Sequence, residues 1–345
     1  MSKLGIGIVG VGEMGQRHAE NLRRLVPEAR LVAIADRDSR RAGKVAAELE
    51  IEHAYHDLEA LLERKDIQAV VIATPDKFHT DAVRAAATAG KDIFCEKPLG
   101  LTLASGRAAL EAVERSGVRM QMGFMRRYDP AHVLARQQVL GGEIGDPIIF
   151  KAIGRDKDMP PIAAYQSRIN GMLFYTNSIH DFDSARWLMN DEVSEVHSLT
   201  TVNTHPELAQ YDDVVASLVN LRFQKGAIGN VESYAQCLYG YDVRTEIVGS
   251  KGSILLGTIR NHSATLFRSN GGTYQLADHF LARFREAYLA QLVDFVHNIL
   301  NDQPLRVTGE DGLRALEIAV AAEESHRRGV SCTVDATQVM APHFD

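Results

Sequence analysis

Short apolar runs alternate with helical stretches over the first third of the chain. The runs cover residues 6–9, 31–35, 69–74, 92–95 and 118–122. Most of the intervals between them carry apolar residues at helical spacing, as in residues 103–116 before Gly117. Strands that alternate with helices form a parallel sheet covered on both faces. The pattern therefore predicts a doubly wound α/β domain of the Rossmann type over residues 1–122.

The pattern changes after Gly123. Period-two alternation, typical of strands, follows a helix at 130–140 and covers residues 148–153, 193–202, 214–223, 227–233, 242–248 and 253–256. Turn signals separate neighbouring runs at 224–226 and 249–252. Further helices are expected at about 178–189, 282–300 and 310–328. Residues 123–345 are therefore predicted to form an α+β domain with a large, mostly antiparallel open sheet.

Composition narrows the class of protein. The 345 residues suffice for two domains, and a net charge of -7 argues against a nucleic-acid partner. No window approaches 18 uninterrupted apolar residues, so no membrane span is expected. Cys95, Cys237 and Cys332 lack metal-ligand spacing, so no metal site is expected. With no secretory leader at the start, these features favour a cytoplasmic protein.

The turn after the first strand carries the G-x-G-x-x-G spacing of dinucleotide-binding proteins. Gly10 permits the tight turn, Gly12 lets a pyrophosphate approach, and Gly15 lets the next helix pack against the strand. Glu13 and Met14 open that helix, whose N-terminus attracts phosphate. An ordinary glycine turn in a β-α unit is the alternative. We expect these five residues to contact a dinucleotide cofactor.

An acidic residue follows the second strand. Asp36 stands twenty-one positions after Gly15, where a carboxylate accepts hydrogen bonds from the adenosine ribose. Its charge would repel a 2′-phosphate, which favours NAD over NADP. Arg37, in the densest basic cluster of the chain with Arg40 and Arg41, softens this preference. NAD is the predicted cofactor, with NADP as the alternative.

Polar residues follow the strand at 69–74. Thr74 and Pro75 come at its end, and His79 opens the next helix. Cofactor chemistry gathers at the carboxyl ends of parallel strands, so all three are candidate cofactor contacts. Thr and Pro are also ordinary turn and helix-start residues, and a structural role is the alternative.

The strand at 92–95 ends in Glu96, Lys97 and Pro98. Pro98 fixes the backbone direction, in one reading through a cis bond. A lysine at a buried strand end places its amine where the sheet opens toward its ligand, where it donates to a substrate hydroxyl. Glu96 and Lys97 are therefore candidate cofactor contacts, and Lys97 is a candidate catalytic residue as well.

One helix of the second domain holds the other candidates. Ser178 and Asp181 are three apart, as in a capping box, which predicts a structural role for both. His180 and Asp183 share a helix face, with Trp187 one turn beyond. His180 is a candidate catalyst, although a histidine near a helix start is more often structural.

Motifs from end to end of the chain resemble those of the Gfo/Idh/MocA oxidoreductases, most closely their inositol 2-dehydrogenase branch. They lie at residues 10–15, Thr74-Pro75 with His79, 96–98, 123–129, 154–156 with Pro160-Pro161, 179–181 with Asp183, 239–242, 249–252, and Arg283-Phe284 with Ala287-Tyr288. This resemblance implies a Rossmann domain followed by a sheet domain whose open face often builds homodimers or homotetramers.

The resemblance also implies the roles of the site residues. Lys97 and His180 would lie on either side of a polyol or sugar next to the nicotinamide. His180 would act as acid and base on the reacting hydroxyl, and Lys97 would hold the same oxygen. The candidates to bind the other hydroxyls are Arg127, Arg155, Asp183, Tyr239 and Tyr241.

One position departs from the family. Thr176 stands where an Asp commonly precedes the catalytic His by four residues, and we count it as a third candidate catalytic residue. A threonine hydrogen-bonds but supplies no negative charge to stabilise an imidazolium. Two alternatives to an NAD-dependent dehydrogenase therefore stay open. One is a non-catalytic NAD- and sugar-binding regulator, and the other is an NAD-dependent glycoside hydrolase.

Overall fold

The structure is a computed structural model that describes residues 3–167, 172–260 and 264–334. Its described residues fall into two compact units. The first holds residues up to 125 together with 288–316, and the second holds residues 126–287 and 317–334, apart from the gaps just given. The first unit thus includes a segment that the sequence pattern assigned to the second domain.

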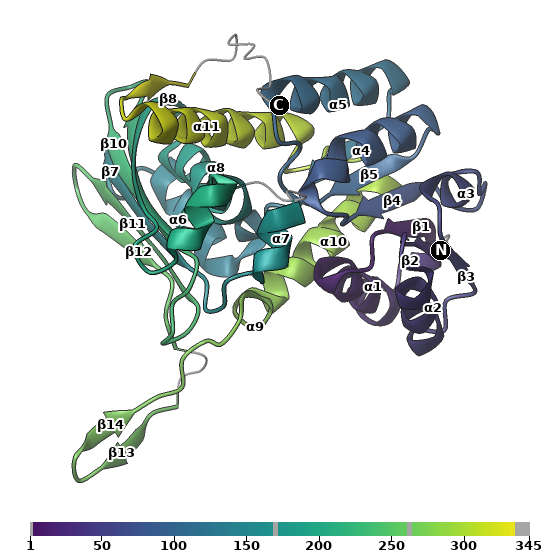
Figure 1. The fold of residues 1–345 in the computed structure, drawn as a ribbon, viewed down its shortest axis with the longest axis horizontal. Helices are drawn as coiled ribbons and strands as arrows, with labels where there is room; N and C mark the ends of the chain where they lie inside the picture. Colours follow the sequence, from purple (N-terminus) through teal and green to yellow (C-terminus); the bar gives the residue numbers. More distant parts are fainter. Residues whose placement is uncertain (1–2, 168–171, 261–263, 335–345) are drawn as a thin grey trace. The chain divides into compact units, whose positions relative to one another are not determined.

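A six-stranded parallel sheet forms the centre of the first unit, in the order β3-β2-β1-β4-β5-β6. Figure 1 labels β1 to β5 of this sheet. The strands are β1 (Leu4–Val9), β2 (Ala29–Ala35), β3 (His53–Tyr55), β4 (Ala69–Ile72), β5 (Asp92–Cys95) and β6 (Met120–Met122). Successive strands are added on one side of β1 up to β3 and on its other side from β4 onward, and doubly wound sheets bind ligands at this switch point. The predicted Rossmann arrangement is confirmed.

Helices cover both faces of this sheet. Ile8 of the sheet shares a core with Leu22, Val45 and Phe295, which come from three different helices. The helices on this face are α1 (Glu13–Leu25), α2 (Ser39–Glu48) and α10 (Arg285–Leu300). On the other side lie α3 (Leu58–Leu62), the short η1 (Asp76–Phe78), α4 (His79–Thr88) and α5 (Leu103–Ser116).

The second unit is built on a seven-stranded sheet in the order β12-β11-β7-β10-β9-β8-β15. Its strands are β7 (Pro147–Arg155), β8 (Val193–Thr201), β9 (Ala216–Phe223), β10 (Ile228–Tyr234), β11 (Asp242–Gly249), β12 (Ser253–Leu256) and β15 (Cys332–Thr333). β7 and β10 pair in parallel and the other pairs are antiparallel. The predicted α+β domain with a mostly antiparallel sheet is confirmed.

Helix α11 (Gly309–Arg328) packs against one face of this sheet, and the other face carries exposed side chains. Ser198 of β8 donates through its N–H to Ser325 Oγ at 2.9 Å, which fixes the C-terminal part of α11 on the sheet. On the opposite face Leu218, Asn220 and Arg222 of β9 point outward. The helical segments are η2 (Met125–Tyr128), α6 (Pro130–Leu140), α7 (Ile162–Ser167), η3 (Phe174–Ser178), α8 (Ile179–Met189), η4 (Pro206–Tyr211), α9 (Phe280–Arg283) and α11 (Gly309–Arg328).

A two-stranded hairpin, β13 (Leu266–Arg268) and β14 (Gly271–Thr273), was not predicted from the sequence. It forms a separate sheet, and its residues are exposed. Among the described residues, no helix is long and apolar enough to cross a membrane.

The predicted capping box at Ser178 is wrong. Residues 174–178 form a π-helix that runs directly into α8, so Ser178 lies inside a continuous helical segment. Its hydroxyl is 2.8 Å from Ser233 Oγ, and Asp181 forms an ion pair with Arg126. The helical segment already includes the buried residues just before Ser178, so the Ser-x-x-Asp spacing has no exposed N-terminus to cap.

Candidate functional site

The three glycines of the first turn have the surroundings that their predicted roles require. Gly10 has φ +84°, and a Cβ there would lie 2.7 Å from the Ala73 carbonyl oxygen. A Cβ on Gly15 would lie 1.9 Å from the Gly10 oxygen, so the close packing of α1 on this turn needs glycine. Gly12 has nothing within 4 Å of such a Cβ. The open side of Gly12 therefore leaves the backbone accessible to a phosphate group.

The start of α1 offers donors to the same place. Gly12 is its N-cap, with no side-chain cap bond, and Glu13 and Met14 begin the helix. The Thr74 hydroxyl is buried and has no hydrogen-bond partner among the described residues. Thr74 also lies against the turn, because its N is 2.8 Å from the Cβ position of Gly10. Helix amides and an unsatisfied hydroxyl fit a nucleotide bearing phosphates and ribose hydroxyls.

Asp36 follows β2 and is held by four donors. Its carboxylate accepts from the backbone N–H groups of Val11 at 2.9 Å and Asp38 at 2.8 Å. Arg41 donates through Nε at 3.0 Å and Nη2 at 2.7 Å. Burial opposes ionisation of Asp36, but these hydrogen bonds outweigh it and lower the pKa of the carboxyl. Sequence reasoning recorded Arg41 only as part of a basic cluster.

Arg37 and Phe78 lie beside each other in the same unit. The Arg37 guanidinium is 4.5 Å from the centre of the Phe78 ring, within cation–π range. Phe78 ends η1, which follows Thr74 and Pro75, so this contact joins the segment after β2 to the segment after β4. Arg37 is therefore a second cationic residue near Asp36 in sequence, in addition to Arg41.

His79 connects the ends of two strands. Its Nδ1 lies 2.7 Å from the Pro98 oxygen and its Nε2 lies 2.7 Å from the Thr74 oxygen. The ring is buried, so these contacts tie the segment after β4 to the segment that carries Lys97. The structure gives His79 a bracing role, and direct contact with the cofactor stays a prediction.

Glu96 is also braced, by a residue that the sequence analysis did not select. Its Oε1 is 2.7 Å from Nε2 of His18, a buried residue of α1. Gly123 makes room for the same carboxylate, because a Cβ there would lie 2.9 Å from Oε2. No local signal singles out His18, because its partner Glu96 lies 78 positions away along the chain.

Lys97 is the single partly exposed residue between Ile93 and Gly100. The Lys97–Pro98 peptide bond is cis, as one reading of the sequence had it. The arrangement presents a cationic side chain from an otherwise buried strand end.

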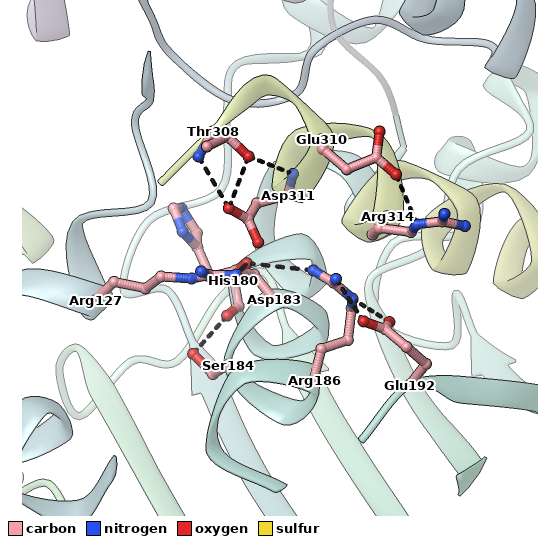
Figure 2. A network of polar contacts seen from close by, with 10 residues as sticks. All are labelled: Arg127, His180, Asp183, Ser184, Arg186, Glu192, Thr308, Glu310, Asp311 and Arg314. Carbon is pink, nitrogen blue, oxygen red and sulfur yellow. Dashed lines mark hydrogen bonds and ion pairs between the residues drawn. The ribbon is translucent and has the colours of Figure 1, made fainter. Parts of the chain in front are cut away.

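The helical segment with His180 is buried almost all round. Between Met172 and Met189 only Thr176, His180 and Trp187 are partly exposed. Thr176 Oγ1 donates to the Met172 oxygen at 3.3 Å. Ser184 Oγ donates to the His180 oxygen at 2.8 Å (Figure 2). A helix that exposes only these side chains presents the imidazole and the threonine together.

Arg127 and Asp183 form a two-pronged ion pair next to His180 (Figure 2). Arg127 Nε is 2.9 Å from Oδ2, and Nη2 is 2.6 Å from Oδ1. Both side chains are buried, and the guanidinium lies 5.7 Å from the Trp187 ring centre. The negative charge of Asp183 is therefore already compensated, so Asp183 is poorly placed to supply the charge that Thr176 lacks.

A second network of buried charged side chains joins residues of η2, α6, α8 and α9. Arg126 pairs with Asp181, and Asp129 accepts from Arg283 at 3.1 Å and lies 2.7 Å from His132 Nδ1. Burial opposes ionisation of Asp129, yet these partners lower its pKa to about 2. Burial lowers the pKa of His132. Sequence reasoning missed this network because Asp181 and Arg283 are distant along the chain from the partners that they contact in residues 126–132.

Arg155 and Tyr239 are brought together at the ends of β7 and β11. Arg155 donates to Glu232 and to the Tyr239 hydroxyl, each at 2.5 Å, and Tyr239 donates to Asp242 at 2.6 Å. Burial, followed by this bond to Asp242, raises the pKa of Tyr239 to about 12. Tyr241 lies apart from this group, buried against the rings of Phe280 and Phe284.

No group of three or more His, Cys, Asp or Glu side chains is arranged to hold a metal ion in the part of the chain that the structure describes.

Two family models match the chain. Residues 4–124 match the oxidoreductase family with an NAD-binding Rossmann fold, and residues 136–334 match the C-terminal alpha/beta domain of the same family. The chain belongs to the Gfo/Idh/MocA oxidoreductases. It is therefore an NAD-binding oxidoreductase, and the predicted family is confirmed.

Curated and solved relatives agree with this assignment. The chain is 40% identical to scyllo-inositol 2-dehydrogenase (NAD(+)) of Bacillus subtilis over 95% of each chain. It is 37% identical to Myo-inositol 2-dehydrogenase of Thermotoga maritima, over 93% of this chain and 95% of that protein. The crystal structure of scyllo-inositol dehydrogenase from Lactobacillus casei with bound NAD(H) and scyllo-inositol is 28% identical, with a TM-score of 0.90, and covers 96% of this chain and 99% of that one.

Proposed function

We propose that this protein is an NAD-dependent dehydrogenase that transfers hydride between the nicotinamide and a secondary hydroxyl of a cyclic polyol of the inositol class. The observation that carries the proposal is the buried helix that exposes only Thr176, His180 and Trp187. The similarity to inositol dehydrogenases of Bacillus subtilis and Thermotoga maritima over nearly the whole chain supports the choice of substrate class.

His180 acts as the acid and base. Oxidation of an alcohol requires removal of the hydroxyl proton while hydride leaves the same carbon, and NAD supplies the hydride acceptor. The neutral imidazole of His180 takes that proton, and the imidazolium returns it in the reverse direction. Lys97 donates a hydrogen bond to the reacting oxygen and stabilises its developing negative charge.

The other polar side chains orient the ring of the substrate. A polyol offers several hydroxyl groups, each a donor and an acceptor. Arg127 with Asp183 forms a preassembled pair that holds fixed directions for such groups. Arg155 and Tyr239 lie instead on the open sheet face, with Leu199 and Leu218. A site that hydrogen-bonds a hydroxyl discriminates strongly against an analogue that lacks it. The Arg127–Asp183 pair therefore sets which stereoisomer reacts.

We also propose that the protein works as a homodimer or homotetramer through the open face of the second sheet. Leu199 and Leu218, on β8 and β9, are 56% and 42% exposed in the single chain. Large apolar side chains on a sheet face that no helix covers are typical of protein interfaces.

The test is the initial rate of NADH formation with NAD over myo-, scyllo- and chiro-inositol and a set of aldoses. Turnover of an inositol supports the proposal. Binding of NAD without turnover of any compound would favour the regulator instead. Release of an aglycone from glycosides without net NADH would favour the glycoside hydrolase.

A further inference from the structure

The carboxylate of Asp36 has donors at all of its acceptor positions. A carboxylate offers about four lone-pair sites, two on each oxygen. Oδ1 accepts from the Asp38 N–H and Arg41 Nη2, and Oδ2 accepts from the Val11 N–H and Arg41 Nε. A ribose hydroxyl that reaches this carboxylate must therefore displace or share one of these four bonds.

Arg41 is the donor that can give way. The Val11 and Asp38 N–H groups belong to the glycine turn and to the N-cap of α2, where the backbone is fixed. The Arg41 side chain is 48% exposed, while that of Asp36 is 5% exposed. The long Arg41 side chain can swing into solvent without moving the backbone, and a ribose hydroxyl then takes the acceptor sites that it leaves on Asp36.

The same guanidinium changes which nucleotide the site tolerates. A lone Asp36 carboxylate would repel the 2′-phosphate of NADP, but Arg41 offsets this charge at hydrogen-bond distance. The planar guanidinium also matches phosphate oxygens in two-pronged geometry. Arg37, held over Phe78, adds a second cation beside Asp36 in sequence.

We propose that Arg41 sets the balance between NAD and NADP, by exchanging from Asp36 to the 2′-phosphate, so that the protein binds NADPH as well as NADH. The inference concerns the nucleotide site of the first unit alone. It does not depend on the proposed polyol chemistry, because it is tested by nucleotide binding without substrate.

The experiment is a fluorescence titration of the full chain with NADH and with NADPH, for the wild type, Arg41→Ala and Arg41→Lys. The wild type is expected to bind both nucleotides. Arg41→Ala should lose about tenfold or more in NADPH affinity, the scale of a lost charged hydrogen bond, while NADH affinity holds or rises. Arg41→Lys keeps the positive charge but lacks the planar, two-pronged geometry of the guanidinium. Its NADPH affinity should therefore lie between those of the wild type and Arg41→Ala.

Arg40→Ala is the matched control, because it removes one positive charge from the neighbouring exposed position of α2. It should leave the NADPH to NADH affinity ratio within about twofold of the wild type, since the structure pairs Asp36 with Arg41 and an exposed charge outside that pair is screened by salt. Unchanged melting temperatures show that the variants fold.

Three outcomes would overturn the proposal. The first is a wild type that does not bind NADPH at millimolar concentration. The second is an Arg41→Ala variant whose affinity ratio is unchanged, including a parallel loss of both nucleotides. The third is an equal shift of the ratio in Arg40→Ala. Absence of polyol turnover would contradict only the proposed function.

Discussion

Gly12 and Gly15 stand three positions apart in the same turn but have different surroundings. A Cβ on Gly15 would meet the Gly10 oxygen at 1.9 Å, whereas a Cβ on Gly12 would meet only open space. We therefore expect Gly15→Ala to lower the free energy of unfolding by about 1–3 kcal/mol, as overpacking does, and to weaken NADH binding. Gly12→Ala should weaken NADH binding without loss of stability. Thermal melts and NADH titrations measure both effects.

Gly43 provides the control for these variants. It lies in α2, and a Cβ there also meets nothing within 4 Å. Gly43→Ala should leave NADH affinity unchanged and add up to about 1 kcal/mol of stability, since alanine favours the helix interior. Equal effects of Gly12→Ala and Gly43→Ala on NADH affinity would contradict the assigned role of Gly12.

At the residue scale, the glycine turn could be located from local sequence, whereas the side-chain contacts around His180 could not. The glycine spacing is local and each glycine has a steric reason to be there. The pairing of Arg127 with Asp183 joins residues 56 positions apart, and only tertiary packing brings them together. His18 behind Glu96 was missed for the same reason.

At the scale of elements, Gly154 decides how closely the His180 helix approaches β7. A Cβ on Gly154 would lie 2.9 Å from both Asn177 Oδ1 and Asp181 Oδ2. Gly154→Ala should push this helix away and lower kcat by about tenfold or more, because small displacements of catalytic groups are costly. NADH affinity should stay unchanged.

Gly252, which precedes β12, is the matched control for Gly154. The nearest atom to a Cβ there is 3.7 Å away, an ordinary contact. Gly252→Ala should retain wild-type kcat. The interpretation fails if Gly154→Ala keeps full activity, or if both variants lose it equally.

Asp213 accepts hydrogen bonds at the start of the same helical segment. Its carboxylate accepts from the N–H groups of Leu173 at 3.1 Å and Val214 at 2.8 Å. Burial raises the pKa of Asp213 to about 6. The unfolded chain loses this proton near pH 4, so between about pH 4 and 6 the native state binds more protons and stability falls as pH rises. The loss, on the order of 3 kcal/mol, is complete above about pH 6.

Asp213→Asn should remove this loss, because the amide oxygen still accepts from Leu173 and Val214 but carries no charge. The variant is expected to melt a few degrees above the wild type at pH 8, with a smaller difference at pH 4.5. Thermal melts at the two pH values measure the effect. A lower melting temperature for the variant at pH 8 would show that the charge stabilises this helix.

The bounds of helices could be predicted from the sequence where the signals that start and end the helix are local. Helix α5 matched its predicted bounds because Thr102 caps one end and Gly117 ends it at φ +67°. The π-helix before α8 did not follow, since Ser178 mimics a cap that the preceding buried residues make unnecessary. The β13–β14 hairpin lacked strong alternation.

At the scale of the whole molecule, the open sheet face predicts self-association. The chain should run in solution at a multiple of its 38.0 kDa mass. Leu218→Asp places a charge on this face and should give monomers, whereas Leu140→Asp, at an exposed position that ends α6, should not. Light scattering after size-exclusion chromatography measures the mass. A monomeric wild type would refute this arrangement.

The catalytic role of His180 is the central claim, and it is tested most directly by a paired measurement on the wild type and His180→Ala. The measurement is NADH formation from NAD with myo- and scyllo-inositol, beside the affinity for NADH. We predict turnover by the wild type and a loss of about a hundredfold or more in kcat for the variant, with NADH affinity unchanged. Equal turnover by both proteins would contradict the assignment of His180 as the acid and base.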